Sequence, residues 1–160
     1  MLRHKLGAWL LPLIALSELL LDQTSKYLIS TNLAFNESWN PIPELYPLIR
    51  ITHWRNSGAA FGLFPELGTL FLAVAVVVII GILRYARTLN GDAPLLLRAS
   101  LGLMLGGALG NLLDRVRFGY VVDFINLGWW PVFNLADSAI VIGVFLLALY
   151  SLRAKPTHEA

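Results

Sequence analysis

Two aspartates in the C-terminal half of the sequence could form a catalytic pair. Asp123 lies between apolar Val122 and Phe124, and thirteen residues, 124–136, separate it from Asp137. Two carboxyl groups in contact at low dielectric share one proton, because the second ionisation is penalised. Such a pair can hold a water molecule, take a proton from it and donate a proton to an amide leaving group. The two residues therefore indicate peptide-bond hydrolysis without a serine, a thiol or a metal ion.

Asp137 also has a purely structural interpretation. Asn134 could be the N-cap of a helix, and Asp137 would then be its third residue, where a carboxylate interacts favourably with the helix dipole. This interpretation accounts for Asp137, but it does not account for Asp123 in an apolar setting.

Other catalytic schemes have less support in the sequence. Ser57 lies near His53 but has no defined acid partner, and Ser25 and Lys26 are adjacent, so they would not face each other on a helix. The chain has no cysteine and only three scattered histidines, which excludes a thiolate or histidine metal site. We therefore expect no metal and no cofactor.

The elements that hold these residues belong to a membrane protein. The 160 residues are 57% hydrophobic and only 14% charged, whereas a typical globular chain is about 45–50% apolar and about 25% charged. Four apolar segments are long enough to span a bilayer, at approximately 7–28, 67–84, 95–113 and 133–152. Residues 1–160 are therefore expected to form a single integral membrane domain, all-α and polytopic. The net charge of +2 and the basic residues that flank apolar runs argue against nucleic-acid binding.

The first segment could instead be a cleavable signal peptide, since a basic start and an apolar run precede Ala15-Leu16-Ser17. Glu18, with Asp22 and Lys26 at helical spacing, favours a retained helix. With both termini cytoplasmic, the Lys/Arg count is seven inside and five outside. The inner residues are Arg3, Lys5, Arg84, Arg87, Arg98, Arg153 and Lys155, and the outer ones are Lys26, Arg50, Arg55, Arg115 and Arg117.

Between the spans, two outer loops carry β-formers. Residues 48–54 and 120–124 predict short strands, and residues 56–58 (NSG) predict a turn. Trp54, Trp129 and Trp130 suit a membrane interface.

Further polar residues lie at the outer ends of the spans. Asp22 and Lys26, four positions apart on a helix, could form either a simple ion pair or a site-positioning pair. Gly102, Gly106 and Gly110 form a small-residue ridge that predicts close helix packing. We expect Asp114 and Arg115 to form a network that tethers the helix end, and Asn111 to face a polar cleft.

Five segments together resemble the bacterial lipoprotein signal peptidases, signal peptidase type II. They are residues 22–26 (DQTSK), 56–62 (NSGAAFG), 106–115 (GGALGNLLDR), 122–124 (VDF) and 133–138 (FNLADS). Each is short, but their order and their positions at outer span ends make the combination specific.

The resemblance implies an aspartic endopeptidase of the bacterial inner membrane that cuts diacylglyceryl-modified prolipoproteins just before the lipidated cysteine. Asp123 and Asp137 match the catalytic pair of the family. Its substrate-binding positions match Asn56, Gly58, Asn111, Arg115 and Asn134, and its supporting polar positions match Asp22, Lys26 and Asp114.

The same resemblance implies four transmembrane helices with a small extracytoplasmic β-cradle and an interfacial helix. Lipidated substrates and membrane lipid would be the partners, and the chain would be a monomer with its active site near the outer face. The thirteen residues between the aspartates are few for the family. The rival class is a non-enzymatic four-helix transporter or assembly factor, in which the acids would line an ion path.

Overall fold

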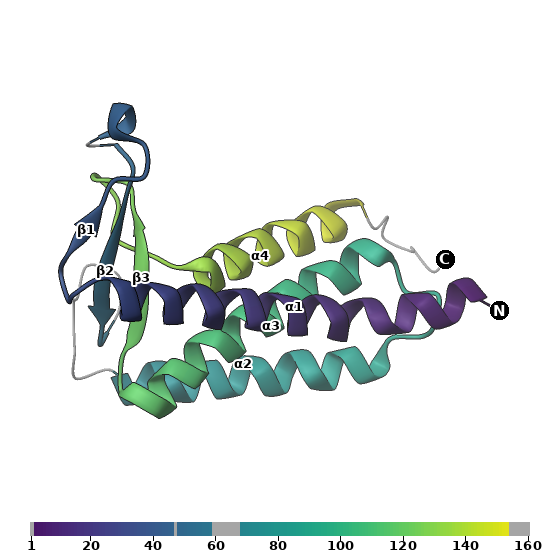
Figure 1. Ribbon diagram of the computed structural model, residues 1–160. Coiled ribbons are helices and arrows are strands. Elements are labelled where there is room, and N and C mark those ends of the chain that lie inside the picture. The colour runs from purple at the N-terminus through teal and green to yellow at the C-terminus, as the bar shows by residue number, and fades with distance from the viewer. Residues whose placement is uncertain (1, 47, 59–67, 154–160) are drawn as a thin grey trace.

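The protein consists of four long helices and a small antiparallel sheet at one end of them (Figure 1). The computed structural model describes residues 2–46, 48–58 and 68–153. In chain order the elements are α1 (Leu2–Asn32), β1 (Ser38–Trp39), the 3-10 turn η1 (Pro43–Leu45), β2 (Arg50–Asn56), α2 (Gly68–Thr88), α3 (Leu95–Phe118), β3 (Val121–Asn126) and α4 (Leu135–Arg153).

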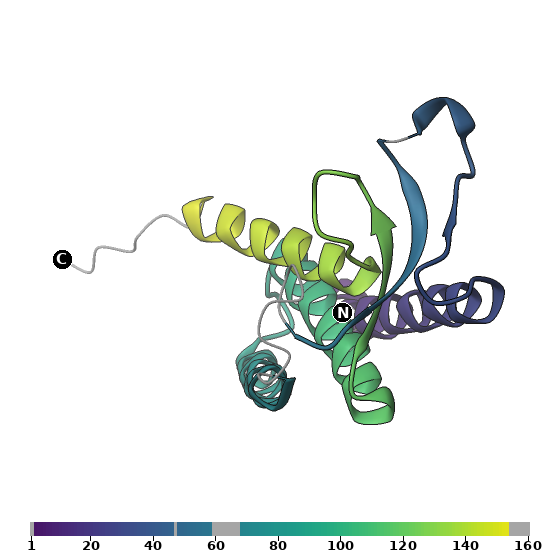
Figure 2. The ribbon, with the colours of Figure 1, turned by 90° about the vertical axis from the view of Figure 1, so that its left-hand side faces the viewer.

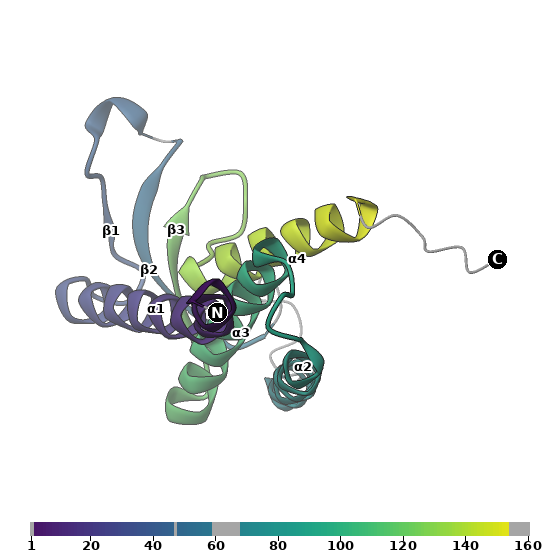
Figure 3. The same cartoon turned by 90° about the vertical axis from the view of Figure 1, so that its right-hand side faces the viewer.

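Helix α3 is the central element of the bundle. It packs against α1, α2 and α4, whereas α2 stands apart from α4 on the far side of α3 (Figure 3). Its buried leucines, with Ala108, form the core together with residues of α1 and α2. That core contains Leu97, Leu101, Leu105, Ala108, Leu11, Ala15, Ile79 and Ile82.

The glycines of α3 allow the close approach that the sequence predicted. A Cβ at Gly102 would lie 2.9 Å from Ile14 Cβ, and one at Gly106 would lie 2.7 Å from the carbonyl oxygen of Ala15. On the neighbouring face, a side chain at Gly107 would clash with the Ala136 carbonyl of α4. The ridge therefore brings α1 and α4 against α3 at the level of the polar residues.

Among the residues that the structure describes, three helices are long and apolar enough to cross a membrane, with spans of Thr69–Thr88, Leu95–Phe118 and Leu135–Arg153. These helices expose apolar side chains on the outside of the bundle. Examples are Val77 of α2 and Val141 and Phe145 of α4. Helix α1 is 31 residues long, but it carries charged residues along its length and is not among these three.

Each helix extends past the C-terminal end of its predicted span, whereas α2 and α4 begin one and two residues later than predicted. The segment predicted at 95–113 continues as helix to Phe118, and the one predicted at 7–28 is helical from Leu2 to Asn32. Pro12 is accommodated within α1.

The three-stranded sheet has the order β1-β2-β3. The predicted strand at 48–54 is β2, and the one at 120–124 is β3. Arg50 pairs with Asn126 and Asn56 with Val121, and a register irregularity falls between Ile51 and Trp54. In the described part of the outer loops, the only helical element is the three-residue turn η1.

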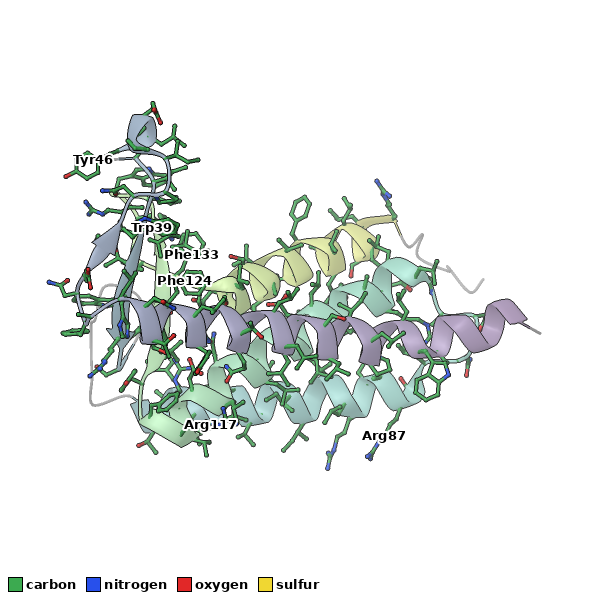
Figure 4. All side chains as sticks on the ribbon, in the orientation of Figure 1. Trp39, Tyr46, Arg87, Arg117, Phe124 and Phe133 are labelled. Carbon is green, nitrogen blue, oxygen red and sulfur yellow. The ribbon has the colours of Figure 1, made fainter. Side chains whose placement is uncertain are left out.

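The sheet covers one end of the bundle and projects past it on the side of α4 (Figures 1 and 2). Helix α1 begins and α4 ends at the opposite end (Figure 1). Labelled side chains mark the two ends, because Arg117 lies at the sheet end and Arg87 at the other (Figure 4). The polar residues singled out from the sequence are therefore collected where the sheet meets the helices.

Candidate active site

A tight turn places Asp123 at the junction of the sheet and the bundle. Helix α3 ends at Gly119, which adopts a left-handed conformation with φ of 78° and donates its N–H to the Arg115 carbonyl at 3.0 Å. Glycine suits this position because a side chain would be strained there. The chain then reverses into β3, in which Asp123 is only 1% exposed.

Asp137 is the third residue of α4, and Asn134 is its N-cap, as predicted. The Asp137 N–H donates to Asn134 Oδ1 at 2.8 Å, and the Asn134 N–H donates to Asp137 Oδ2 at 3.2 Å. This reciprocal arrangement is a capping box, which satisfies two backbone donors that the helix cannot use itself. It also fixes the Asp137 carboxylate relative to Asn134.

Asn134 connects the two aspartates. Its side chain is fully buried, and its Nδ2 donates to Asp123 Oδ1 at 2.7 Å while its backbone N–H holds Asp137. Because one residue contacts both carboxylates, the structure brings Asp123 and Asp137 to the same site.

Each carboxylate accepts two hydrogen bonds from neutral amide groups. On Asp123, the second donor is Asn56 Nδ2, at 2.9 Å from Oδ2. On Asp137, the second donor is Asn111 Nδ2, at 2.8 Å from Oδ1. These four bonds fix the orientation of both carboxylates, and no cation of the described residues forms an ion pair with either of them.

The neighbours of Asn111 determine which way its amide group faces. Its Oδ1 accepts from Lys26 Nζ at 3.0 Å and from Asn134 Nδ2 at 3.1 Å. With the oxygen held by two donors, the Nδ2 group must face Asp137. Lys26 is thus linked to Asp137 by hydrogen bonds through the amide group of Asn111.

Lys26 is buried between two further carboxylates. Its Nζ lies 2.9 Å from Asp22 Oδ2 and 3.0 Å from Asp114 Oδ2, so one lysine of α1 joins an acid of its own helix to an acid of α3. The predicted Asp22–Lys26 pair is therefore part of a larger positioning network.

The two supporting acids hold the backbone beside the two catalytic candidates. Asp22 Oδ1 accepts the N–H of Ala136, the residue before Asp137, at 3.1 Å. Asp114 Oδ2 accepts the N–H of Val122, the residue before Asp123, also at 3.1 Å. Through these bonds α1 and α3 set the separation of the pair.

The predicted Asp114–Arg115 network is wrong. Asp114 pairs with Lys26, and the described residues contain no ion pair between Asp114 and Arg115. Adjacent helical residues point in different directions. Arg115 instead donates weakly to the Asn111 carbonyl, at 3.4 Å, and its guanidinium lies 5.9 Å from the ring centre of Phe71.

Gln23 was not predicted as part of the site. Its Nε2 donates to Asp114 Oδ1 at 3.0 Å and lies 3.3 Å from the Gly110 carbonyl. The signal was present in the sequence, since Gln23 follows Asp22 in the first motif.

Gly58 acts on the site through Asn56. Its N–H donates to Asn56 Oδ1 at 3.1 Å, which leaves the Nδ2 group for Asp123. The remainder of that motif, residues 59–62, lies outside the described residues.

Burial, and next to it the nearby charge of Asp137, raise the pKa of Asp123 to about 7. The hydrogen bonds from Asn56 and Asn134 and the charge of Lys26 act in the opposite direction, because they favour the ionised form. Near neutral pH, Asp123 is therefore poised to gain or lose a proton.

An apolar cavity opens onto Asn111 and Arg115 from the side of the bundle. It has a volume of about 200 Å³ between α2, α3 and α4. Its other lining residues are Phe71, Val74, Ala75, Val78, Met104, Ala108 and Ile140. Within the described ranges, no cluster of three or more histidine, aspartate or glutamate residues could hold a metal ion.

Comparison with known proteins shows the family of this chain. The family model described as Signal peptidase (SPase) II matches residues 14–153. The chain belongs to the signal peptidase II family. It is 56% identical over 135 residues to the lipoprotein signal peptidase of Moorella thermoacetica, which covers 84% of this chain and 87% of that one. It is 46% identical over 138 residues to the lipoprotein signal peptidase of Halothermothrix orenii, covering 86% and 92%.

Solved structures agree with the family assignment. The structure of a bacterial membrane enzyme at 2.3 Å resolution superposes with a TM-score of 0.80 at 32% identity, covering 92% of this chain and 90% of that one. The prediction of a lipoprotein-processing peptidase of the aspartic type is therefore confirmed, and a non-enzymatic transporter is excluded.

Proposed function

We propose that Asp123 and Asp137 are the catalytic residues with which this member of the family cleaves the signal peptide of a lipoprotein precursor. The observation that carries the proposal is the pair of buried carboxylates joined by Asn134, each held by two amide donors. A pair held in this way is available to a water molecule through its remaining lone pairs.

In this mechanism the pair carries one proton. The ionised carboxylate takes a proton from the water, and the water oxygen attacks the carbonyl carbon of the scissile bond. The protonated carboxyl group donates to the carbonyl oxygen. When the tetrahedral intermediate collapses, the C–N bond breaks and the leaving nitrogen takes the proton now on one carboxyl group. One hydroxyl group of the intermediate gives its proton to the other carboxylate as the new carbonyl forms, so the pair again carries one proton. The pKa of Asp123, about 7, allows this exchange at neutral pH.

The signal peptide would lie in the apolar cavity between α2, α3 and α4. A helix from the bilayer could enter there sideways, because α2 packs mainly on α3 and leaves the cavity between itself and α4. Asn111 and Arg115 line this cavity, and Asn111 also donates to Asp137. Their polar groups would satisfy the backbone near the scissile bond, where no water is available.

The substrate in this proposal is a prolipoprotein that carries a diacylglyceryl group on cysteine, cleaved just before that cysteine. Its acyl chains would remain in the surrounding lipid. The apolar surfaces of α2 and α4 support this placement, because they expose long hydrophobic side chains to the bilayer.

In the bacterial inner membrane, all four helices would span the bilayer, and the enzyme would act as a monomer. Both ends of the chain would be cytoplasmic, since α1 begins and α4 ends at the end opposite the sheet (Figure 1). The sheet and the active site would then lie at the outer face. Exposed Trp129 and Trp130 would then lie at the outer membrane–water interface.

The test is cleavage of a synthetic lipidated peptide by the purified enzyme, with the products located by mass spectrometry. We expect one cut, just before the lipidated cysteine, that a metal chelator does not inhibit. A cut elsewhere, or loss of activity with the chelator, would contradict the proposal.

A further inference from the structure

A second, polar cavity lies on the sheet. Its volume is about 300 Å³, and we call it the Arg50 cavity. Its lining residues are Asn36, Arg50, Thr52, Trp54, Asn56, Asn126, Gly128, Trp130, Pro131 and Val132.

The Arg50 cavity has an uncompensated positive charge. Arg50 forms no ion pair among the described residues, and its buried Nε atom has no hydrogen-bond partner there. No acidic residue of the described chain lines the cavity.

Other polar groups of the cavity are already oriented by the protein. Thr52 Oγ1 shares a hydrogen bond of 2.8 Å with Ser38 Oγ and accepts a second one from Asn126 Nδ2 at 3.1 Å. Arg50 pairs with Asn126 across the sheet, so the free guanidinium lies beside this fixed network. A free guanidinium in a partly buried polar cavity is complementary to a carboxylate, which it can bind through two hydrogen bonds.

The cavity adjoins the active site. Asn56 lines it and also donates to Asp123 Oδ2 at 2.9 Å. Trp54, another lining residue, is the cross-strand partner of Asp123. In the proposed function the signal peptide occupies the apolar cavity between α2, α3 and α4. The polypeptide after the scissile bond would then lie along the sheet, next to the Arg50 cavity.

We propose that the Arg50 cavity binds the substrate on the C-terminal side of the scissile bond, and that Arg50 selects an acidic side chain there. The inference rests on the proposed function. Arg50 and Asn56 are six positions apart on β2, which is about 20 Å of strand at roughly 3.3 Å per residue. The arginine side chain can reach back along the strand, so its guanidinium can lie closer to the active site than the Arg50 backbone does. An extended substrate has a similar rise per residue, so we place the acidic residue about three to six residues after the cut.

The test compares lipidated peptides that differ only by aspartate or asparagine at one of these positions. For the wild-type enzyme we expect kcat/KM to be about five- to tenfold higher for the aspartate peptide than for the asparagine peptide at one position. A preference of this size lies between that expected from an exposed ion pair and that expected from a buried charged hydrogen bond. In Arg50→Gln this ratio should fall to about one. The control Arg87→Gln, at the opposite end of the molecule, should keep the wild-type ratio (Figure 4).

A charge exchange makes the test independent of how Arg50→Gln folds. Arg50→Glu should reverse the preference, so that a peptide with lysine at that position is cleaved faster than one with aspartate. Equal cleavage of all peptides by the wild type, or a preference unchanged in Arg50→Gln, would overturn the inference while leaving the proposed function intact. If Arg50 instead binds a lipid phosphate, Arg50→Gln would alter cleavage of all peptides equally, and only in bilayers with anionic lipid, which also overturns it. Failure to cleave any peptide would overturn the proposed function itself.

Discussion

At the scale of single residues, Asn134 has two structural roles that different atoms of its side chain perform. Its Oδ1 caps α4, and its Nδ2 positions Asp123. Serine can supply the capping oxygen but not the planar amide donor. The two roles can therefore be tested with two substitutions at one position.

We expect Asn134→Ser to fold with nearly wild-type stability but to lose at least tenfold in kcat, because the aspartates are no longer joined. Asn134→Ala should lose activity and also about 1 kcal/mol of stability, because the cap is removed. Thermal unfolding in detergent and peptide cleavage measure the two effects. Full activity in Asn134→Ser would show that the bridge to Asp123 is dispensable.

The proton of the catalytic pair gives a second prediction at this scale. Folding raises the pKa of Asp123 from 3.8 to about 7, so the native state binds this proton more tightly than the unfolded chain. The contribution of Asp123 to stability is therefore present at low pH and is lost as the pH rises between about 4 and 7. Activity should fall at alkaline pH, with an apparent pKa near 7 that belongs to the pair.

Asn56→Ala removes a hydrogen bond that favours ionised Asp123. The alkaline limb of kcat/KM should consequently move to higher pH, whatever the variant does to the overall rate. A limb that stays in place or moves to lower pH would disagree with this electrostatic account.

At the scale of elements, the glycines of α3 determine how closely α1 can approach. A Cβ at Gly106 would meet both the Ala15 carbonyl and Glu18 Cβ at 2.7 Å, whereas one at Gly81 of α2 would meet nothing within 4 Å. The same substitution at these two positions thus separates packing from helix propensity.

Gly106→Ala should destabilise the protein by about 1–3 kcal/mol, because the backbones must move apart. Gly81→Ala should be neutral or stabilising by up to about 1 kcal/mol, because alanine is the better helix former. Thermal unfolding in the same detergent measures the stability of both variants relative to the wild type. Equal stability of the two variants would argue against tight α1–α3 packing.

The elements were also the most predictable part of the structure. The long apolar runs predicted the helices, and the β-forming runs at 48–54 and 120–124 predicted β2 and β3. Both predictions are possible because hydrophobic pattern and β-propensity are local properties of the sequence. Helix ends were less predictable, since α3 continues with polar residues to Phe118.

Within the site, the Asn134–Asp137 cap could be predicted because it is local. The bond of Lys26 to Asp114 could not, because it joins residues of two helices far apart in sequence. Sequence adjacency favoured an Asp114–Arg115 network instead.

At the scale of the whole molecule, the orientation in the membrane can be tested with single cysteines, because the natural sequence has none. Trp129, 75% exposed, lies at the sheet end, and Asn90 lies in the connection between α2 and α3 at the other end. We expect a membrane-impermeant maleimide to label Trp129→Cys in intact cells and Asn90→Cys only in opened membranes. The reverse pattern would place the active site at the cytoplasmic face.

The most direct test of the central claim is cleavage of a lipidated peptide by Asp123→Asn and by Asp137→Asn, each checked for membrane insertion and thermal stability. Asp92→Asn is the matched control, because Asp92 is exposed in the connection between α2 and α3, away from the pair. The account predicts that both dyad variants insert and fold but lose at least a thousandfold in kcat, while Asp92→Asn cleaves like the wild type. Normal cleavage by either dyad variant would contradict it.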